Sequence, residues 1–242
     1  MKYIIEFSKT GTICYTSHLD IMKVFKRAFK KSGIEIAYSQ GFNPHPKMGF
    51  GQPLSLGYWG LEEYVEFETA ASEIADENMP PEDMLKAVAG VMPEGLRLNR
   101  IIPAPWLRKT LAAENVAAEY IIEIPQVEMD QTGEELRDAY MSQEQILVLK
   151  KQKKKPEPVQ IDIKNKIRTI DIRRSEEGIY IHCILDSGSE SNLSPELLIQ
   201  SFTSYFHLDI PRYDMNVARK RLFFKEDTEK AIRADSAHEA IS

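Results

Sequence analysis

The stretch SHLDIMKVFKRAFKKSG, residues 17–33, decides the fold of the first half of the chain, because its pattern is that of an amphipathic helix. Ser17 can cap the N-terminus, Asp20 provides an acidic variant of the capping box, and Gly33 can end the helix. On a helical wheel the apolar side chains separate from the basic ones. The apolar set is Ile21, Met22, Phe25, Ala28 and Phe29, and the basic set is Lys23, Lys26, Arg27, Lys30 and Lys31. We therefore expect the apolar side to enter a core.

The basic side of this helix has two interpretations. It is either a solvated face, which is the usual role of a charged helical stripe, or a surface that follows phosphates. Soluble helices normally alternate glutamate with lysine at i,i+4 spacing. Here the five exposed charges of the wheel are all basic, which favours the phosphate-binding interpretation.

The elements expected around this helix give the first half its fold class. Strands are expected at residues 2–8 with an extension at 13–15, at 34–38 and at 96–102, with further strand material at 50–56 and 62–69 and a second helix from residue 80 to about 92. Residues 64–68 alternate with a period of two, as strands do. The resulting order, strand, helix, strand, strand, helix, strand, is that of ferredoxin-like folds.

The second half repeats this order more loosely. Strands are expected at residues 118–124, 144–150, 160–163, 167–174, 178–185 and 214–224, and helices at 132–142 and 195–206. We predict an α+β protein of two ferredoxin-like (β-α-β-β-α-β) halves with antiparallel sheets. The predicted domains are residues 1–108 and 109–225, followed by a polar, partly helical tail at 226–242.

The loop YSQGFNPHPKMGFG, residues 38–51, follows the first helix and second strand. Its glycines permit unusual backbone angles, while Pro44 and Pro46 stiffen the chain. A stiff loop that presents Gln40, Asn43, His45 and Lys47 is a candidate binding site. The alternative is a hairpin-like connection in which His45 caps or packs.

Bulk composition indicates a folded protein without a membrane span. Hydrophobic residues make up 43% of the chain and charged residues 28%. No apolar run is long enough to cross a bilayer, and the N-terminus does not resemble a signal peptide, so we expect a cytoplasmic protein. The net charge is −6, but residues 15–50 carry six basic and two acidic side chains, whereas residues 58–85 carry nine acidic and no basic ones. Such local patches can bind polyanions despite the net charge.

Four motifs together resemble one protein family. They are SKTG at 8–11, SHLD at 17–20, YSQGFNPHP at 38–46, and Pro53-Leu54 followed by Gly57. The set resembles the bacterial radical-SAM-linked family, a domain of unknown function (number 2344). The second half matches in general form only, through Asp162, the loop 191–193 with Pro195, and Arg219. In relatives a similar module is fused to, or encoded beside, a radical-SAM protein. The resemblance implies an accessory role with a radical-SAM protein acting in trans.

The cysteines agree with that role. Cys14 and Cys183 are the two cysteines of the chain and form no C-x-x-C pair. Two thiolates cannot supply the three usual for a radical-SAM cluster, and we expect reduced, buried thiols. The spacing of Cys14, His18 and His45 matches no zinc pattern, so we expect neither a metal nor a cofactor.

The candidate nucleic-acid-binding residues are Lys23, Arg27, Lys30, Lys31, Gln40, Asn43, His45, Lys47, Arg219 and Arg221. Arg219 and Arg221 share a strand face, which could hold phosphates or protect a sheet edge. Lys150, Lys151, Lys153, Lys154 and Lys155 form either a solvated loop or an RNA-contacting arm. The sequence contains no G-x-G-x-x-G, P-loop or G-x-S-x-G motif.

Three functions remain open. The first is an RNA-binding or substrate-presenting module for a radical-SAM enzyme that modifies RNA or a ribosomal component. The second is an RNA-processing enzyme in which His18 or His45 is the general acid or base. The alternative for His18 is a structural role, in which it packs beside a helix that Ser17 and Asp20 cap. The third is a protein–protein adaptor that uses the acidic residues of 58–85.

Overall fold

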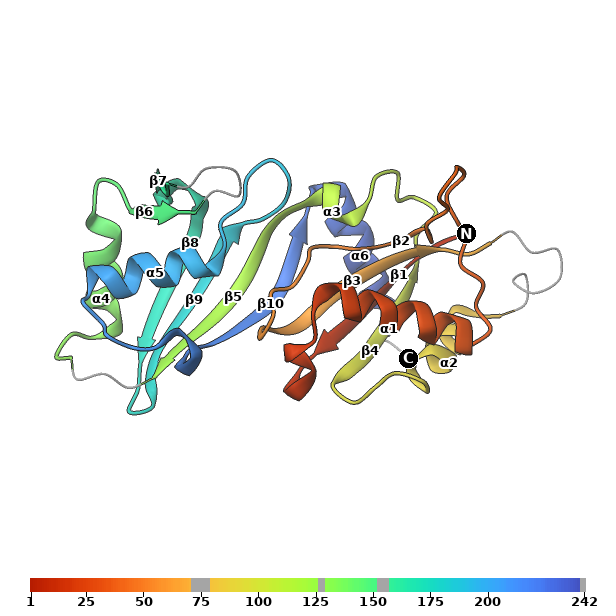
Figure 1. The fold of residues 1–242 in the computed structure, drawn as a ribbon, viewed down its shortest axis with the longest axis horizontal. Coiled ribbons are helices and arrows are strands. Elements are labelled where there is room, and N and C mark those ends of the chain that lie inside the picture. Colours follow the sequence, from red (N-terminus) through yellow and green to blue (C-terminus); the bar gives the residue numbers. More distant parts are fainter. Residues whose placement is uncertain (71–78, 126–128, 152–156, 240–242) are drawn as a thin grey trace. The chain divides into compact units, whose positions relative to one another are not determined.

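The computed structural model describes residues 1–70, 79–125, 129–151 and 157–239, and it has mixed helices and mostly antiparallel strands (Figure 1). The chain forms two compact units. The first comprises Met1–Asn115 and Arg221–Ser242, and the second comprises Val116–Lys220. The first division lies close to the predicted boundary after residue 108. The second differs, because residues 221–242 return to the first unit. In the described part of the chain, no helix is both long and apolar enough to cross a membrane.

The sheet of the first unit is antiparallel. The strands are β1 (Lys2–Lys9), β2 (Met48–Phe50), β3 (Trp59–Glu68) and β4 (Leu96–Pro103), and the helices between them are α1 (His18–Lys31) and α2 (Pro81–Ala89). β1 lies between β4 and β3, and β2 pairs with β3. Ile5 faces Val65 and Ile101 in the register.

Three of the strand segments expected in the first half were wrong. Of the segment expected at 50–56, only Phe50 lies in a strand, at the end of β2, and residues 51–58 belong to no strand. Residues 13–15 do not extend the first strand but belong to a 3₁₀ helix, η1 (Gly11–Tyr15). Residues 34–38 form no continuous strand and make two isolated bridges, from Ile36 to Thr69 and from Tyr38 to Pro46. Pro46 has no N–H to continue a ladder, so regular pairing begins only at Met48 in β2.

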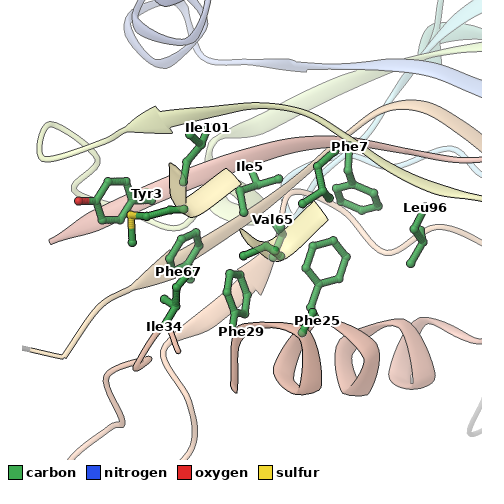
Figure 2. Close-up of a cluster of buried hydrophobic side chains, with 14 of the residues drawn as sticks. Tyr3, Ile5, Phe7, Phe25, Phe29, Ile34, Val65, Phe67, Leu96 and Ile101 are labelled. Atoms are coloured by element: carbon green, nitrogen blue, oxygen red, sulfur yellow. The ribbon is translucent and has the colours of Figure 1, made fainter. Parts of the chain in front are cut away.

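The core of the first unit lies between the sheet and helices α1 and α2. Figure 2 shows Phe25 and Phe29 rising from α1 towards Val65, Phe67 and the residues of β1. Phe25 is fully buried, and its ring lies 5.0 Å from that of Phe7 and 5.5 Å from that of Phe50. The apolar side predicted for residues 17–33 therefore fixes α1 against the sheet, which leaves its basic side facing outward.

The opposite face of this sheet carries charged groups that hold the last helix, α6 (Glu226–Glu239). Arg100 donates to Glu6 at 2.7 Å and to the carbonyl of Ile232 at 2.9 Å. Arg233 donates to Glu62 at 2.9 Å, and Ile232 is buried. The segment predicted as a polar tail thus includes a helix whose side chains pack into the first unit.

The second unit has a comparable order with an inserted hairpin. Its strands are β5 (Asn115–Pro125), β6 (Leu147–Lys150), β7 (Val159–Asp162), β8 (Ile167–Arg174), β9 (Gly178–Asp186) and β10 (Asn216–Phe224), and its longer helices are α4 (Gly133–Ser142) and α5 (Pro195–Tyr205). The strand order is β10-β5-β9-β8, while β6 and β7 form a separate two-stranded sheet. Asn115 and the segment Arg221–Phe224 are assigned to the first unit.

Thr132 begins α4 with a capping box. Its hydroxyl accepts from the backbone N–H of Glu135 at 3.3 Å, and the Glu135 carboxylate accepts from the N–H of Thr132 at 2.7 Å. We expect Thr132→Ala to lower the free energy of unfolding by about 1 kcal/mol, because one N–H of the first turn loses its acceptor. Urea unfolding of the whole chain measures this, and Thr132→Ser should restore most of the loss. Equal stability of Thr132→Ala and the wild type would show that the cap is not formed.

Candidate nucleic-acid interface

The basic side of α1 and the start of the 38–51 loop line one groove of about 740 Å³ in the first unit. Lys26, Arg27 and Lys30 contribute from α1, and Tyr38 and Pro46 contribute from the loop. Such a volume lies within the range of ligand sites, about 300–1,000 Å³. The helix and the loop, which the sequence singled out separately, thus border the same concave surface.

Most of the positive charge in this region has no paired carboxylate. Lys26, Arg27, Lys30 and Lys31 make no ion pair within residues 1–70, 79–125, 129–151 and 157–239. Lys23 is the exception, because its ammonium lies 2.9 Å from Asp20. Asp20, which the sequence places at the helix cap, lies about one turn before Lys23 and neutralises this one cation of the basic side. Glu35 also lines the groove and adds one negative charge to it.

The loop is a closed hairpin-like turn whose tip projects into solvent. The N–H of Ser39 donates to the carbonyl of His45 at 2.8 Å, and the N–H of His45 donates to the Ser39 hydroxyl at 3.0 Å. Gly41 has φ 143°, a conformation that side chains rarely adopt. These bonds close the loop at its base and leave the ring of Phe42 fully exposed at its tip.

The predicted contact residues of the loop differ in whether their side chains already have a partner. Gln40, Asn43 and His45 are all exposed, and none of their side chains has a hydrogen bond among the described residues. Lys47 instead pairs with Glu68 at 3.0 Å. The first three side chains can therefore reach a ligand without breaking an internal bond, whereas Lys47 would have to leave or share its partner.

A second cavity, of about 310 Å³, lies beside the loop and contains a carboxylate that the sequence analysis missed. Glu66 lines it and accepts from the N–H of Leu111 at 3.2 Å. Leu111 begins α3 (Leu111–Glu114). The alternation of β3 gave a signal, because Glu66 lies between the buried Val65 and Phe67 and so on the other face of the sheet.

Burial raises the pKa of Glu66 to about 7, against the opposing effects of the Leu111 N–H and Lys2. Glu66 therefore holds its proton more tightly in the folded chain than in the unfolded one. Its contribution to stability is complete below pH 4.5 and is lost as the pH rises to about 7. At neutral pH both protonation states are populated, so small changes at the cavity can shift the balance.

A family model described as an uncharacterized protein conserved in bacteria (DUF2344) matches residues 2–195. The chain belongs to this family. Among curated proteins no sequence matches. Among solved structures, the chain is similar to one in a crystal structure of a Cbf5-Nop10-Gar1 complex, with 13% identity and a TM-score of 0.49. The similarity covers 93% of this chain and 51% of that one, so this DUF2344 member spans about half the length of the chain it matches.

The two arginines of β10 do not form the predicted pair. Arg219 is 1% exposed, so it cannot contact a phosphate at the surface of this DUF2344 chain. Arg221 is half-buried, with its guanidinium 4.4 Å above the ring of Phe223. Buried residues alternate at Val217 and Arg219 and again at Leu222 and Phe224, with a step of three residues from Arg219 to Leu222. The two arginines therefore lie in different environments.

His18 packs against the core, as the structural alternative for this residue predicts. Its ring makes an edge contact with Phe50 at 5.0 Å, and Ser17 caps the helix by accepting from the N–H of Asp20 at 3.2 Å. His18 also lines a small cavity with Lys9 and Glu63, both buried. In the described ranges no three His, Cys, Asp or Glu side chains are placed to hold a metal ion.

The cysteines are buried in separate units. Cys14 lies in the first unit and Cys183 in the second, and neither forms a disulfide. Burial raises the pKa of the Cys183 thiol to about 12, which keeps it protonated at neutral pH. Both thiols are buried, as expected.

The acidic segment offers fewer free charges than its composition indicated. Glu63 is buried, Glu62 binds Arg233, Glu66 lines the cavity, and Glu68 binds Lys47. Residues 71–78 lie outside the described residues, as do Lys153, Lys154 and Lys155 of the predicted lysine arm. Three of the four acidic side chains of β3, Glu62, Glu63 and Glu68, are thus buried or paired within the first unit, which makes them less available to a partner.

Proposed function

We propose that this protein is an accessory RNA-binding module that presents its substrate to a radical-SAM enzyme in the cytoplasm. The supporting observation is the groove in which Lys26, Arg27 and Lys30 face the same space as Tyr38. Phosphates need cations that are not already neutralised, and these three make no ion pair within the part of the chain that is described.

Exposed rings favour single-stranded RNA over a duplex as the ligand. Tyr38 is 59% exposed, and Phe42 projects from the loop tip. Unpaired bases stack on such rings, with about 1–3 kcal/mol per base, and amide side chains read base edges. In the sequence Gln40 lies between the two aromatic residues and Asn43 directly follows Phe42, and both side chains are exposed. A strand could thus place its backbone along α1 and its bases over the loop.

The fold assignment in this proposal is two ferredoxin-like halves. The first unit has the order β1-α1-β2-β3-α2-β4, with β4-β1-β3 side by side and β2 on β3. In the second unit, β5, β8, β9 and β10 take the corresponding places in the order β10-β5-β9-β8. The hairpin β6-β7 is then an insertion between the helix α4 and β8. Such sheets commonly carry RNA-binding surfaces, which is an analogy from fold.

The radical-SAM partner comes from the resemblance of the sequence motifs, and it requires its own test. We expect a radical-SAM protein encoded beside this chain to co-purify with it, and the complex to persist when RNA is digested. Absence of the complex in both conditions would remove the partner from the proposal and leave RNA binding intact.

The salt dependence of RNA binding tests the central claim. If the three groove cations each contact a phosphate, the logarithm of affinity should fall with the logarithm of salt at a slope of about −2, since each contact on a single strand contributes about −0.7. Affinity for a single-stranded oligonucleotide should then drop about twenty-fold between 50 and 200 mM salt. Filter retention at both concentrations measures it. Failure to retain RNA at 50 mM would end the RNA-binding proposal.

A further inference from the structure

The cavity beside β2 and β3 has the size and the polar groups of a small-ligand site. Its volume of about 310 Å³ is at the lower end of the range for such sites. Glu66 is its one carboxylate without an ionic partner, and it makes no hydrogen bond besides that from Leu111 among the described residues. A Cβ at Gly49 would lie 3.2 Å from Glu66 Oε1, so the glycine keeps the space in front of the carboxylate open.

The charged groups around Glu66 come from three segments. Lys2 of β1 donates to the carbonyl of Leu107 at 2.9 Å, and Lys47 pairs with Glu68 of β3 at 3.0 Å. The backbone N–H of Leu111 completes the surroundings. With Glu66 ionised, the two ammonium groups and two carboxylates balance. The lining then has no net charge, so a ligand that is neutral beside Glu66 and anionic beside Lys2 and Lys47 matches the local charges at both ends.

We propose that this cavity binds a guanine nucleotide, with the base donating to Glu66 and the phosphate near Lys2 and Lys47. Guanine presents N1–H and N2–H side by side, and a carboxylate, which only accepts, can take both. Adenine presents a donor beside the N1 lone pair, which an ionised carboxylate repels. An arginine side chain offers similar donors but brings no anionic group for Lys2 and Lys47.

The inference rests on the proposed function, because the nucleotide would be part of the RNA that the groove binds. Pro46 lines both this cavity and the basic groove, so the two sites adjoin at the loop. Because Glu66 lies on the sheet face opposite α1, a strand in the groove would have to pass around Pro46 to place a base in the cavity. The cavity would then select guanine in an RNA that the groove holds by its phosphates.

The test uses the full chain and mononucleotides, which need no groove. Calorimetric titration at pH 8 should show GMP bound at least tenfold more tightly than AMP, with IMP, which lacks the N2 amine, in between. Glu66→Gln keeps the side-chain shape and the Leu111 bond but should abolish the preference. Lys47→Met should weaken GMP and AMP equally, because it acts on the phosphate.

Proton binding to Glu66 supplies a second readout. Since its pKa is about 7, the ratio of GMP to AMP affinity should fall about tenfold from pH 8 to pH 6 as the carboxylate becomes neutral. AMP carries the same phosphate, so any effect of phosphate protonation on affinity cancels in the ratio. In Glu66→Gln the ratio should not change with pH. Thermal unfolding confirms that each variant is folded.

The outcomes separate the two proposals. Equal affinity for GMP and AMP, or no binding of either, overturns the guanine site even if RNA is retained at low salt. Selective GMP binding without RNA retention supports the cavity and ends the RNA-binding proposal. The double variant Arg27→Glu with Lys30→Glu should lose RNA and keep GMP selectivity, because neither residue lines the cavity.

Discussion

Reversing two charges on α1, by Arg27→Glu with Lys30→Glu, is expected to lower the affinity for single-stranded RNA by about two orders of magnitude at low salt. Each reversal removes one attraction and adds one repulsion, and each such contact at close range in water is about 1 kcal/mol before screening. Both side chains are exposed and line the groove. The core side of α1 is untouched, so the helix should remain folded.

A matched control separates the groove from net charge. Arg97→Glu with Arg173→Glu changes the net charge by the same amount on exposed strand residues that do not line the groove. This control should reduce RNA binding only slightly, and circular dichroism should match the wild type for both variants. Equal losses in the two double variants would mean that general charge, not the groove, governs binding.

Phe25→Ala is expected to lower the free energy of unfolding of the first unit by about 3–5 kcal/mol. Phe25 is fully buried and makes ring contacts with Phe7, Phe29 and Phe50. Its removal leaves a cavity beneath α1 that the packed rings cannot close. Whole domains are stable by about 5–15 kcal/mol, so this loss is a large fraction of the total. We therefore expect the basic side chains of the helix to be held less firmly in place.

Chemical unfolding followed by circular dichroism measures that loss, with two comparisons. Phe25→Leu should lose less, since more of the volume remains. Val24→Ala, at a half-buried position of the same helix, should also lose less. A cost below about 1 kcal/mol for Phe25→Ala would show that α1 is not packed as described.

The elements that the sequence predicted best are those with strong local signals. The helix at 17–33 has a cap at Ser17 and a stop at Gly33 (φ 75°), and both are present. The helix expected at 132–142 forms from Gly133 to Ser142, and Thr132 and Glu135 cap it. In each case the deciding contacts lie within a few residues, so a local pattern is sufficient to predict them.

The features that sequence reasoning missed depend on distant partners. The pairing of residues 34–38 was overestimated because Pro46, eight positions beyond Tyr38, limits the ladder. Arg219 appeared to be a surface cation because period-two alternation does not reveal the change of phase before Leu222. Glu66 was counted among the acidic residues of a segment, and only its place beside Gly49 and Leu111 distinguishes it.

The sequence can suggest that α1 and the loop border one groove, but it cannot give the distance between them. The helix is positioned by Phe25 and its neighbours, and the loop is closed by bonds between Ser39 and His45. Neither fixes the distance between Lys30 and Tyr38. That spacing depends on how residues 34–36 are held, with Ile36 bridged to Thr69 just after β3, which is a contact between distant parts of the chain.

The return of α6 to the first unit has a consequence for synthesis on the ribosome. Arg100 and Glu62 have their partners in Ile232 and Arg233, and the entire second unit lies between them in the sequence. At about 5–20 residues per second, the nascent first unit waits roughly ten seconds for these contacts. During that interval Arg100 and Glu62 lack these partners, so a chaperone has time to bind the uncovered charged face before α6 is synthesised.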